Sequence, residues 1–259
     1  MISIFRTIRQ KLIDSGSVSR YLFYAIGEIL LVVVGILIAL QVNNWNEERL
    51  QRQEEIKVLL NVRSDLLDGI EEMGFLNDLR TKMVGVIDLL VSEREQIINN
   101  YRPEKIDSLL SALTNTPTYN NQSGSLEVLL NTGRINLVRD DTLRTLLISW
   151  PGSVEDMIEG ELDQEELDRD HYRPVLRSYI SINNVYKNYS LAGRIQESDE
   201  IYNRPTGVKS DHTGLLSDPL FENILVNREL LLRIAIIETE ELIDTANEMI
   251  RRIDQNVSN

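Results

Sequence analysis

One apolar run constrains the fold of this 259-residue chain more than any other feature. Residues 21–42 carry a single formal charge, Glu28, and include the sequence ILLVVVGILIAL. As a helix, these 22 residues would extend roughly 33 Å, which is enough to cross a hydrocarbon core about 30 Å thick. A core helix of a soluble protein would carry a polar stripe, and this run has none. We therefore predict a single transmembrane helix over residues 21–43.

The sequence around the run favours a retained anchor over a cleaved signal peptide. Gln41 stands where a signal peptidase requires a small residue, and the segment before the run is too long for a signal n-region. Tyr21, Tyr24 and Trp45 flank the run, where aromatic side chains suit the two membrane interfaces. The lipid bilayer is therefore the first partner that we predict.

The segment before the run predicts the orientation of the chain. Residues 1–20 hold four basic residues and one acid, and Met1, Phe5, Ile8 and Leu12 recur at helical spacing between them. This pattern is typical of a short amphipathic helix on an anionic cytoplasmic leaflet. The numbers of Lys and Arg on the two sides of the run are too similar to decide the orientation by themselves. Long domains, however, are exported largely regardless of their charge. We predict a basic cytoplasmic tail (1–20), an inner-membrane span and an exported, periplasmic domain (44–259).

One face of the predicted span combines an acid with small residues. On a helix this face holds Glu28, Val32, Gly35, Ala39 and Asn43. Gly35 and Ala39 have the small-xxx-small spacing that lets two membrane helices approach closely. Three interpretations of Glu28 remain open: it packs against another helix, it reaches water at the inner interface, or it conducts ions.

The run YAIGEILLVVVGILIALQVNNWNEER, with the basic stretch before it, resembles the N-terminal signature of an uncharacterised family of small single-pass bacterial membrane proteins. Residues 125–147, SLEVLLNTGRINLVRDDTLRTLL, resemble a second stretch of that family, in which a short helix, a Gly and another helix follow one another. The resemblance implies an N-terminal anchor and a mostly helical exported part. It implies no activity, cofactor or catalytic residue.

The rest of the sequence predicts an all-α fold, an extended antiparallel helical bundle. Apolar residues at three- and four-residue steps predict a long helix from Asn46 to about Asn99. The seam of this helix is interrupted by charged and polar residues such as Arg80, which suits a multi-helix bundle better than a two-stranded coiled coil. Asp140 or Asp141 can cap a helix that Pro151-Gly152 ends or kinks.

Two segments complete the predicted bundle. Residues 183–217 lack sustained periodicity and predict an irregular connection. Asp218-Pro219 then predicts the start of a last helix that reaches about Val257. This helix is long enough to return along the first one.

Charge and composition exclude several classes of function. The net charge of −14 repels phosphate backbones, so we expect no nucleic-acid partner. There is no Cys for a disulfide or a thiolate metal site, and no Gly-rich phosphate loop, Gly-x-Ser-x-Gly or His-Glu-x-x-His motif occurs. We predict a protein that is not an enzyme and needs no cofactor.

The candidate metal ligands are few. Asp168 and His171 have an i, i+3 spacing that can offer two ligands from one helix face, and His212 could in principle complete a site. These three are weak candidates, since no second Asp/Glu-x-x-His copy occurs. The acidic run from Glu155 to Asp170 is expected to be a solvated helix face. Five tyrosines are expected to pack under a loop: Tyr172, Tyr179, Tyr186, Tyr189 and Tyr202.

Three functions follow from these observations. The favoured one is a membrane-anchored, non-enzymatic scaffold of the cell envelope that contacts itself or another envelope protein. The second is a channel or ion-coupled membrane subunit that uses Glu28. The third, weaker one is a periplasmic bundle that senses a ligand.

Overall fold

The computed structural model describes residues 18–120, 123–187 and 206–258, and within those ranges every regular element is a helix. The elements are α2 (Val18–Ser92), α3 (Arg94–Asn100), α4 (Pro103–Ala112), α5 (Gly124–Asn131), the 3-10 helix η1 (Arg134–Leu137), α6 (Asp141–Leu167), the π-helix η2 (Asp168–Tyr172), α7 (Arg173–Tyr179), α8 (Ile182–Tyr186), α10 (His212–Ser217) and α11 (Pro219–Ser258). The predicted all-α fold class is confirmed. The chain divides into two compact units, Met1–Lys57 and Val58–Asn259, and α2 contributes residues to both.

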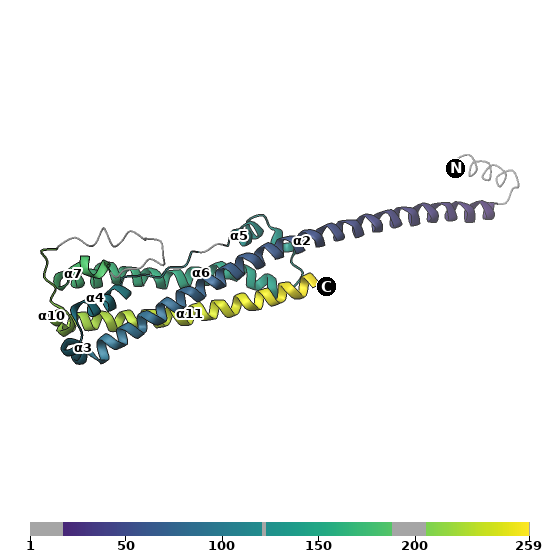
Figure 1. Ribbon diagram of the computed structural model, residues 1–259. Helices are drawn as coiled ribbons and strands as arrows, with labels where there is room; N and C mark the ends of the chain where they lie inside the picture. Colours follow the sequence, from purple (N-terminus) through teal and green to yellow (C-terminus); the bar gives the residue numbers. More distant parts are fainter. Residues whose placement is uncertain (1–17, 121–122, 188–205, 259) are drawn as a thin grey trace. The chain divides into compact units, whose positions relative to one another are not determined.

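Three long helices form the frame of the second unit. They are the part of α2 after residue 57, α6 and α11, which lie side by side in Figure 1. Arg63 Nε donates to Asp254 Oδ1 at 2.8 Å, and Arg94 Nη1 donates to Glu222 Oε2 at 2.5 Å. The start of this part of α2 therefore lies beside the end of α11, so the two helices are antiparallel, as predicted.

Asp140 fixes the start of α6 and links it to α11. Its Oδ1 accepts the backbone N–H of Leu143 at 2.9 Å, which is the capping arrangement that the sequence predicts. Arg252, near the end of α11, reaches the other carboxylate oxygen at 3.2 Å. Because the start of α6 meets the end of α11, these two helices are also antiparallel.

Apolar side chains of the second unit gather in two cores. The first combines α2, α5, α6 and the C-terminal half of α11, with the buried residues Leu59, Val62, Leu66, Met73, Leu76, Tyr119, Leu126, Leu129, Val138, Leu143, Leu147, Trp150, Val154, Met157, Leu242, Ala246, Met249, Ile250 and Ile253. The second combines the end of α2 with α3, α4, the segment 172–185, α10 and the N-terminal half of α11. Both α2 and α11 thus contribute to both cores.

The structure corrects two predicted helix ends. α6 continues through Pro151 from Asp141 to Leu167, so of the two predicted alternatives the one in which Pro151-Gly152 ends this helix is wrong. Pro151 removes one backbone hydrogen bond, but Trp150 and Val154 on either side of it are buried in the first core and hold the helix in place. The first long helix instead stops at Ser92, and α3 begins at Arg94.

The connection predicted as irregular over residues 183–217 contains helical structure at both ends. α8 covers Ile182–Tyr186 and α10 covers His212–Ser217. Residues 188–205, with Tyr189 and Tyr202, lie outside the described residues. The last helix begins as predicted, because Asp218 Oδ1 accepts the N–H of Leu220 at 2.8 Å and Pro219 occupies the first helical position.

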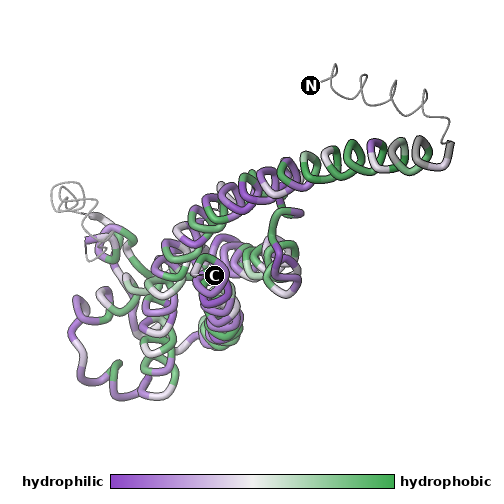
Figure 2. The backbone as a smooth tube through the Cα atoms, turned by 90° about the vertical axis from the view of Figure 1, so that its right-hand side faces the viewer, coloured by the Kyte–Doolittle hydropathy of each residue, from purple (hydrophilic) through white to green (hydrophobic). Residues whose placement is uncertain are grey.

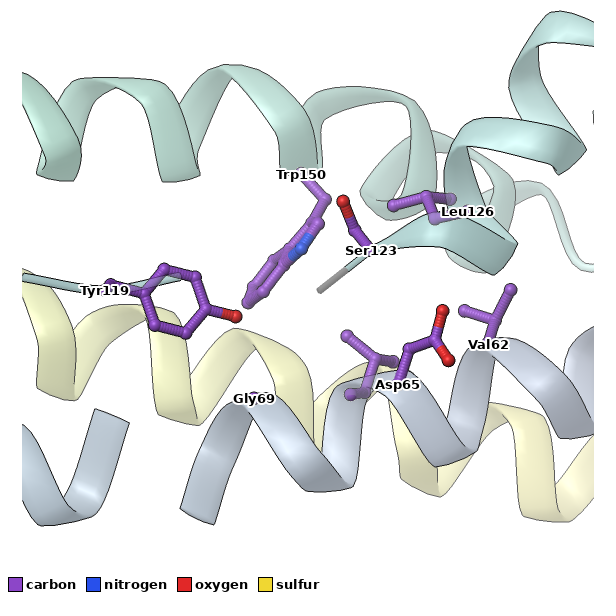
Figure 3. A pocket seen from close by; sticks show the side chains of 8 residues that line it. Val62, Asp65, Gly69, Tyr119, Ser123, Leu126 and Trp150 are labelled. Atoms are coloured by element: carbon purple, nitrogen blue, oxygen red, sulfur yellow. The ribbon is translucent and has the colours of Figure 1, made fainter. Parts of the chain in front are cut away.

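A glycine on α2 makes room for a side chain from the opposite segment. A Cβ at Gly69 would lie 2.8 Å from the hydroxyl oxygen of Tyr119. Figure 3 shows the two residues at the pocket that is lined by Val62, Asp65, Leu66, Gly69, Tyr119, Ser123, Leu126 and Trp150. By contrast, nothing lies within 4 Å of a Cβ at Gly74 or Gly85 of the same helix.

These glycines give a matched stability test. Gly74→Ala and Gly85→Ala should each raise the free energy of unfolding by about 0.5–1 kcal/mol, because Ala favours a helix. Gly69→Ala should instead lower it by about 1 kcal/mol, because the added methyl displaces Tyr119 from a packed site. Thermal unfolding of the full chain in detergent, followed by circular dichroism, measures all three. Stabilisation by Gly69→Ala equal to that by Gly74→Ala would contradict the close contact.

The cap on α6 predicts a pH dependence. The N–H of Leu143 holds the pKa of Asp140 below its usual value, and Arg252 adds to this effect. An acid whose pKa falls on folding stabilises the fold above its unfolded pKa of about 4, and this stabilisation is lost as the pH falls through the folded pKa. Asp140→Ala should therefore cost about 1 kcal/mol at neutral pH and progressively less below pH ~4. The neighbouring exposed Asp141→Ala is the control, with a smaller effect expected at every pH.

Candidate functional site

The first half of α2 presents an apolar surface that no described residue covers. Large apolar side chains between residues 22 and 42 are 43–76% exposed. Figure 2 shows this part of the chain as a nearly continuous hydrophobic stretch. Among the described residues, α2 is the one helix long and apolar enough to cross a membrane. The first candidate functional feature is thus a lipid-binding surface.

The predicted packing face lies within this surface. Its residues are Glu28, Val32, Gly35, Ala39 and Asn43. Val32 is exposed, and a Cβ at Gly35 would meet no atom within 4 Å. Asn43 Nδ2 donates to Glu47 Oε1 at 2.8 Å on the exposed surface. Whether the face binds a second helix stays a prediction.

The predicted interface anchors are only partly described. Trp45 is 64% exposed on α2, just beyond the apolar stretch, as an interface residue would be. Tyr21 and Tyr24 lie in α2, but their side chains fall outside the described residues.

A buried polar layer separates the two cores of the second unit, and it is centred on Arg80. Arg80 is fully buried, and its Nη1 donates to Thr239 Oγ1 at 2.7 Å and to Asn77 Oδ1 at 3.1 Å. Its Nη2 donates to Glu161. The second oxygen of Glu161 accepts the backbone N–H of Tyr119 at 2.8 Å. The layer therefore joins α2, α6, α11 and the segment before α5.

Burial and neighbouring charges shift the pKa values of the residues in this layer. Burial lowers the pKa of Arg80, and the charge of Glu161 opposes this effect. Burial also raises the pKa of Glu161, against the Tyr119 N–H and Arg80, which lower it. The pKa of Tyr119 rises to about 12, first through burial and then through the charges of Glu72 and Glu161. These groups bind one another, so the arrangement favours a structural role over a catalytic one.

A second buried ionic group lies at the π-helix. Asp168 Oδ1 accepts from Arg228 Nη1 at 3.0 Å, and Asp168 Oδ2 accepts from Arg173. Arg228 also donates to the carbonyl of Asn115 at 2.9 Å, and its guanidinium lies 4.7 Å from the centre of the Tyr172 ring. Asp168, which was predicted as a weak metal ligand, is thus bound by two arginines through both of its carboxylate oxygens.

The other weak metal candidates lie in different surroundings. His171 is exposed, whereas the Nε2 of His212 is 2.8 Å from Asp107 Oδ1 on α4. Within the described part of the chain, no group of three His, Cys, Asp or Glu side chains could hold a metal ion.

His212 also lines an open polar cavity of about 220 Å³. The other lining residues are Ile98, Tyr101, Pro103, Ile106, Ser210, Asp211 and Thr213. The hydroxyl, carboxylate and imidazole groups of this lining can form hydrogen bonds with a small polar ligand, and the ring of Tyr101 adds an apolar surface.

Sequence analysis missed both buried ionic groups. Arg80 was visible as an interruption of the apolar seam, but its partner Glu161 lies 81 residues away. Glu161 and Asp168 belong to the acidic run that was expected to be solvated, and both are buried. That expectation is wrong for these two residues. Tyr172 is fully buried and stacks on Phe221 of α11 at 6.1 Å between ring centres, so it packs in the core, whereas packing of the tyrosines under a loop stays a prediction.

The comparisons with known proteins agree with the predicted resemblance. Residues 28–152 match the model of DUF6090, a family of unknown function. The match covers most of the apolar run and the second signature at 125–147, which confirms the resemblance to an uncharacterised family. No curated protein and no solved structure matches the chain.

The polar layer gives a stability test. Arg80→Met should lower the free energy of unfolding by about 3–5 kcal/mol, because it leaves Glu161 as a buried, uncompensated charge. Arg80→Met with Glu161→Gln should be less destabilised than Arg80→Met alone, because Gln is neutral and still accepts the Tyr119 N–H. Thermal unfolding of the full chain in detergent measures both.

Arg63 of α2, which binds Asp254 of α11 near the surface, is the matched control. Arg63→Met should cost less than about 1 kcal/mol. An equal loss for Arg63→Met and Arg80→Met would rule out a special role for the buried layer.

Proposed function

We propose that this protein is a membrane-anchored, non-enzymatic scaffold of the cell envelope. In this proposal one helix spans the inner membrane, the helical bundle lies in the periplasm, and the protein binds itself or another envelope protein. The observation that carries the proposal is the exposed apolar surface of α2.

The energetics of that surface favour a bilayer as its environment. Burying one Leu, Ile or Val side chain is worth about 1.5–3 kcal/mol, and more than ten such residues are exposed between residues 22 and 42. The second unit has two cores of its own, so its fold does not require this stretch. A hydrocarbon environment would remove the stretch from water.

Charge supports the proposed orientation. The basic tail before the span suits the anionic cytoplasmic leaflet, and a long domain after the span can be exported largely regardless of its charge. The matched family model has no described function and so adds no activity to the proposal.

The bundle itself supports a scaffold more than an enzyme. Its most deeply buried charged groups, Arg80, Glu161, Asp168 and Arg228, bind one another or the backbone of the fold. Such groups specify how helices fit together.

Ligand sensing is the second candidate function, and the polar cavity beside His212 is the observation that favours it. A channel role for Glu28 has support from its place in the apolar stretch alone.

Membrane anchoring and topology can be tested in one set of strains. The full chain should stay in the membrane pellet after alkaline carbonate extraction. This treatment releases proteins that are held to the membrane surface by charge, but not a helix that spans the bilayer. Alkaline phosphatase fused after Asn259 should be active, and a β-galactosidase fusion at the same site should be inactive. A chain released into the soluble fraction would refute the anchor, and an inactive phosphatase fusion would refute the orientation.

Self-association through the predicted face has a separate test. Gly35→Leu should reduce chemical crosslinking between full-length copies in lipid vesicles, because a larger side chain separates two closely packed helices. Ile36→Leu, one position away, is the control and should leave crosslinking unchanged. Equal crosslinking of both variants would count against Gly35 as a packing position.

A further inference from the structure

The N-terminal half of α11 is apolar on its outer face as well as on its core face. Val226, Leu230, Ile234 and Ile237 are 40–56% exposed and follow one another at steps of four, four and three residues. In the C-terminal half the same face carries the exposed acids Glu240, Glu241 and Asp244. The apolar stripe therefore has a defined end.

The residues of this face fit the two inner positions of a coiled coil. Asn227, Leu230, Ile234 and Ile237 are spaced by three, four and three residues, and we call them the α11 seam. This spacing assigns Asn227 and Ile234 to position a and Leu230 and Ile237 to position d. A β-branched residue at a with Leu at d favours two parallel strands, and a single Asn at a fixes their register.

The residues beside the seam are complementary between two parallel copies. Position g holds Val226 and Arg233, and position e holds Leu231 and Glu238. In a parallel pair, each g residue faces the e residue five positions later on the other helix. Val226 would thus face Leu231, and Arg233 would face Glu238. In an antiparallel pair, position g would face g and position e would face e, so Arg233 would no longer lie opposite Glu238.

Glu238 is half-buried beside the seam, whereas Arg233 is exposed. The Oε2 of Glu238 is buried and faces α6, since a Cβ at Gly160 would lie 3.4 Å from it. Burial raises the pKa of Glu238, and the nearby carboxylates Glu241 and Asp156 raise it further. Arg233 is on the surface and binds Glu229 of its own helix at 2.6 Å. The charge of Arg80 lowers this pKa in part, and a guanidinium from a second copy near the exposed side of Glu238 would add to that compensation.

From the spacing, the exposure and this charge pairing we infer that the α11 seam binds the same seam of a second copy of this chain in a parallel helix pair. The inference rests on the self-association in the proposed function and names the surface outside the membrane that takes part. A seam of about two heptads is short, and copies anchored in one membrane would meet at a high effective concentration.

Because the chain has no Cys, a single introduced Cys can report this contact. In a parallel pair, Ile234 lies against Ile234 of the second copy. Full-length Ile234→Cys and Ile237→Cys, reconstituted in phospholipid vesicles and oxidised, should each give a disulfide-linked dimer. Ile148→Cys is the matched control, because Ile148 on α6 is 55% exposed and Ile237 is 56% exposed. We expect about tenfold more dimer for the two seam variants than for the control.

A charge substitution beside the seam tests whether the disulfide-linked dimer forms through the seam or through chance collisions. Arg233→Glu, added to Ile234→Cys, places a carboxylate opposite Glu238 and should reduce the dimer several-fold. Arg169→Glu, at an exposed arginine of η2, should leave the yield unchanged.

The outcomes separate this inference from the proposed function. If an amine-reactive crosslinker joins full-length copies but Ile234→Cys and Ile148→Cys give equal dimer, the α11 seam is wrong and self-association stands. Dimer from Ile234→Cys but not from Ile237→Cys would indicate an antiparallel contact and also overturn the inference. If no crosslinker joins the copies, self-association fails and the seam fails with it.

Discussion

The buried layer around Arg80 and Glu161 joins the three long helices of the second unit. Apolar helix faces can slide past one another by a turn with little change in buried area, whereas a buried guanidinium needs its partners in place. Arg80 finds these partners on α6, α11 and the segment before α5. The two hydrophobic cores lie on either side of this layer, so a slip of one long helix against another would break the contacts of Arg80.

Some parts of the chain bury their apolar side chains within the fold, and other parts leave them exposed. Most large apolar side chains of the second unit lie in its two cores. Two exposed apolar surfaces of the described residues carry the proposals: the stretch between residues 22 and 42, and the outer face of α11. The first has the length of a lipid bilayer and the second has the spacing of a helix pair. Both proposals made above follow from this difference.

Local sequence signals predicted much of the fold. Asp140 and Asp218 begin helices as expected, because a cap depends on residues three or fewer positions away. The end of α6 was mispredicted, since burial of Trp150 and Val154 outweighs the local effect of Pro151. The buried polar layer was out of reach, because its members are far apart in sequence and Glu161 sits within a run of acids that are mostly exposed.

The last helix has a consequence for how the protein is made. α11 contributes residues to both cores and Thr239 to the polar layer, yet it is synthesised after every other described helix. The bundle therefore cannot reach its native packing before α11 has been made. A nascent chain with an apolar anchor and two incomplete cores is an aggregation hazard. Biogenesis of this protein should depend on factors that protect the growing polypeptide until α11 has been made.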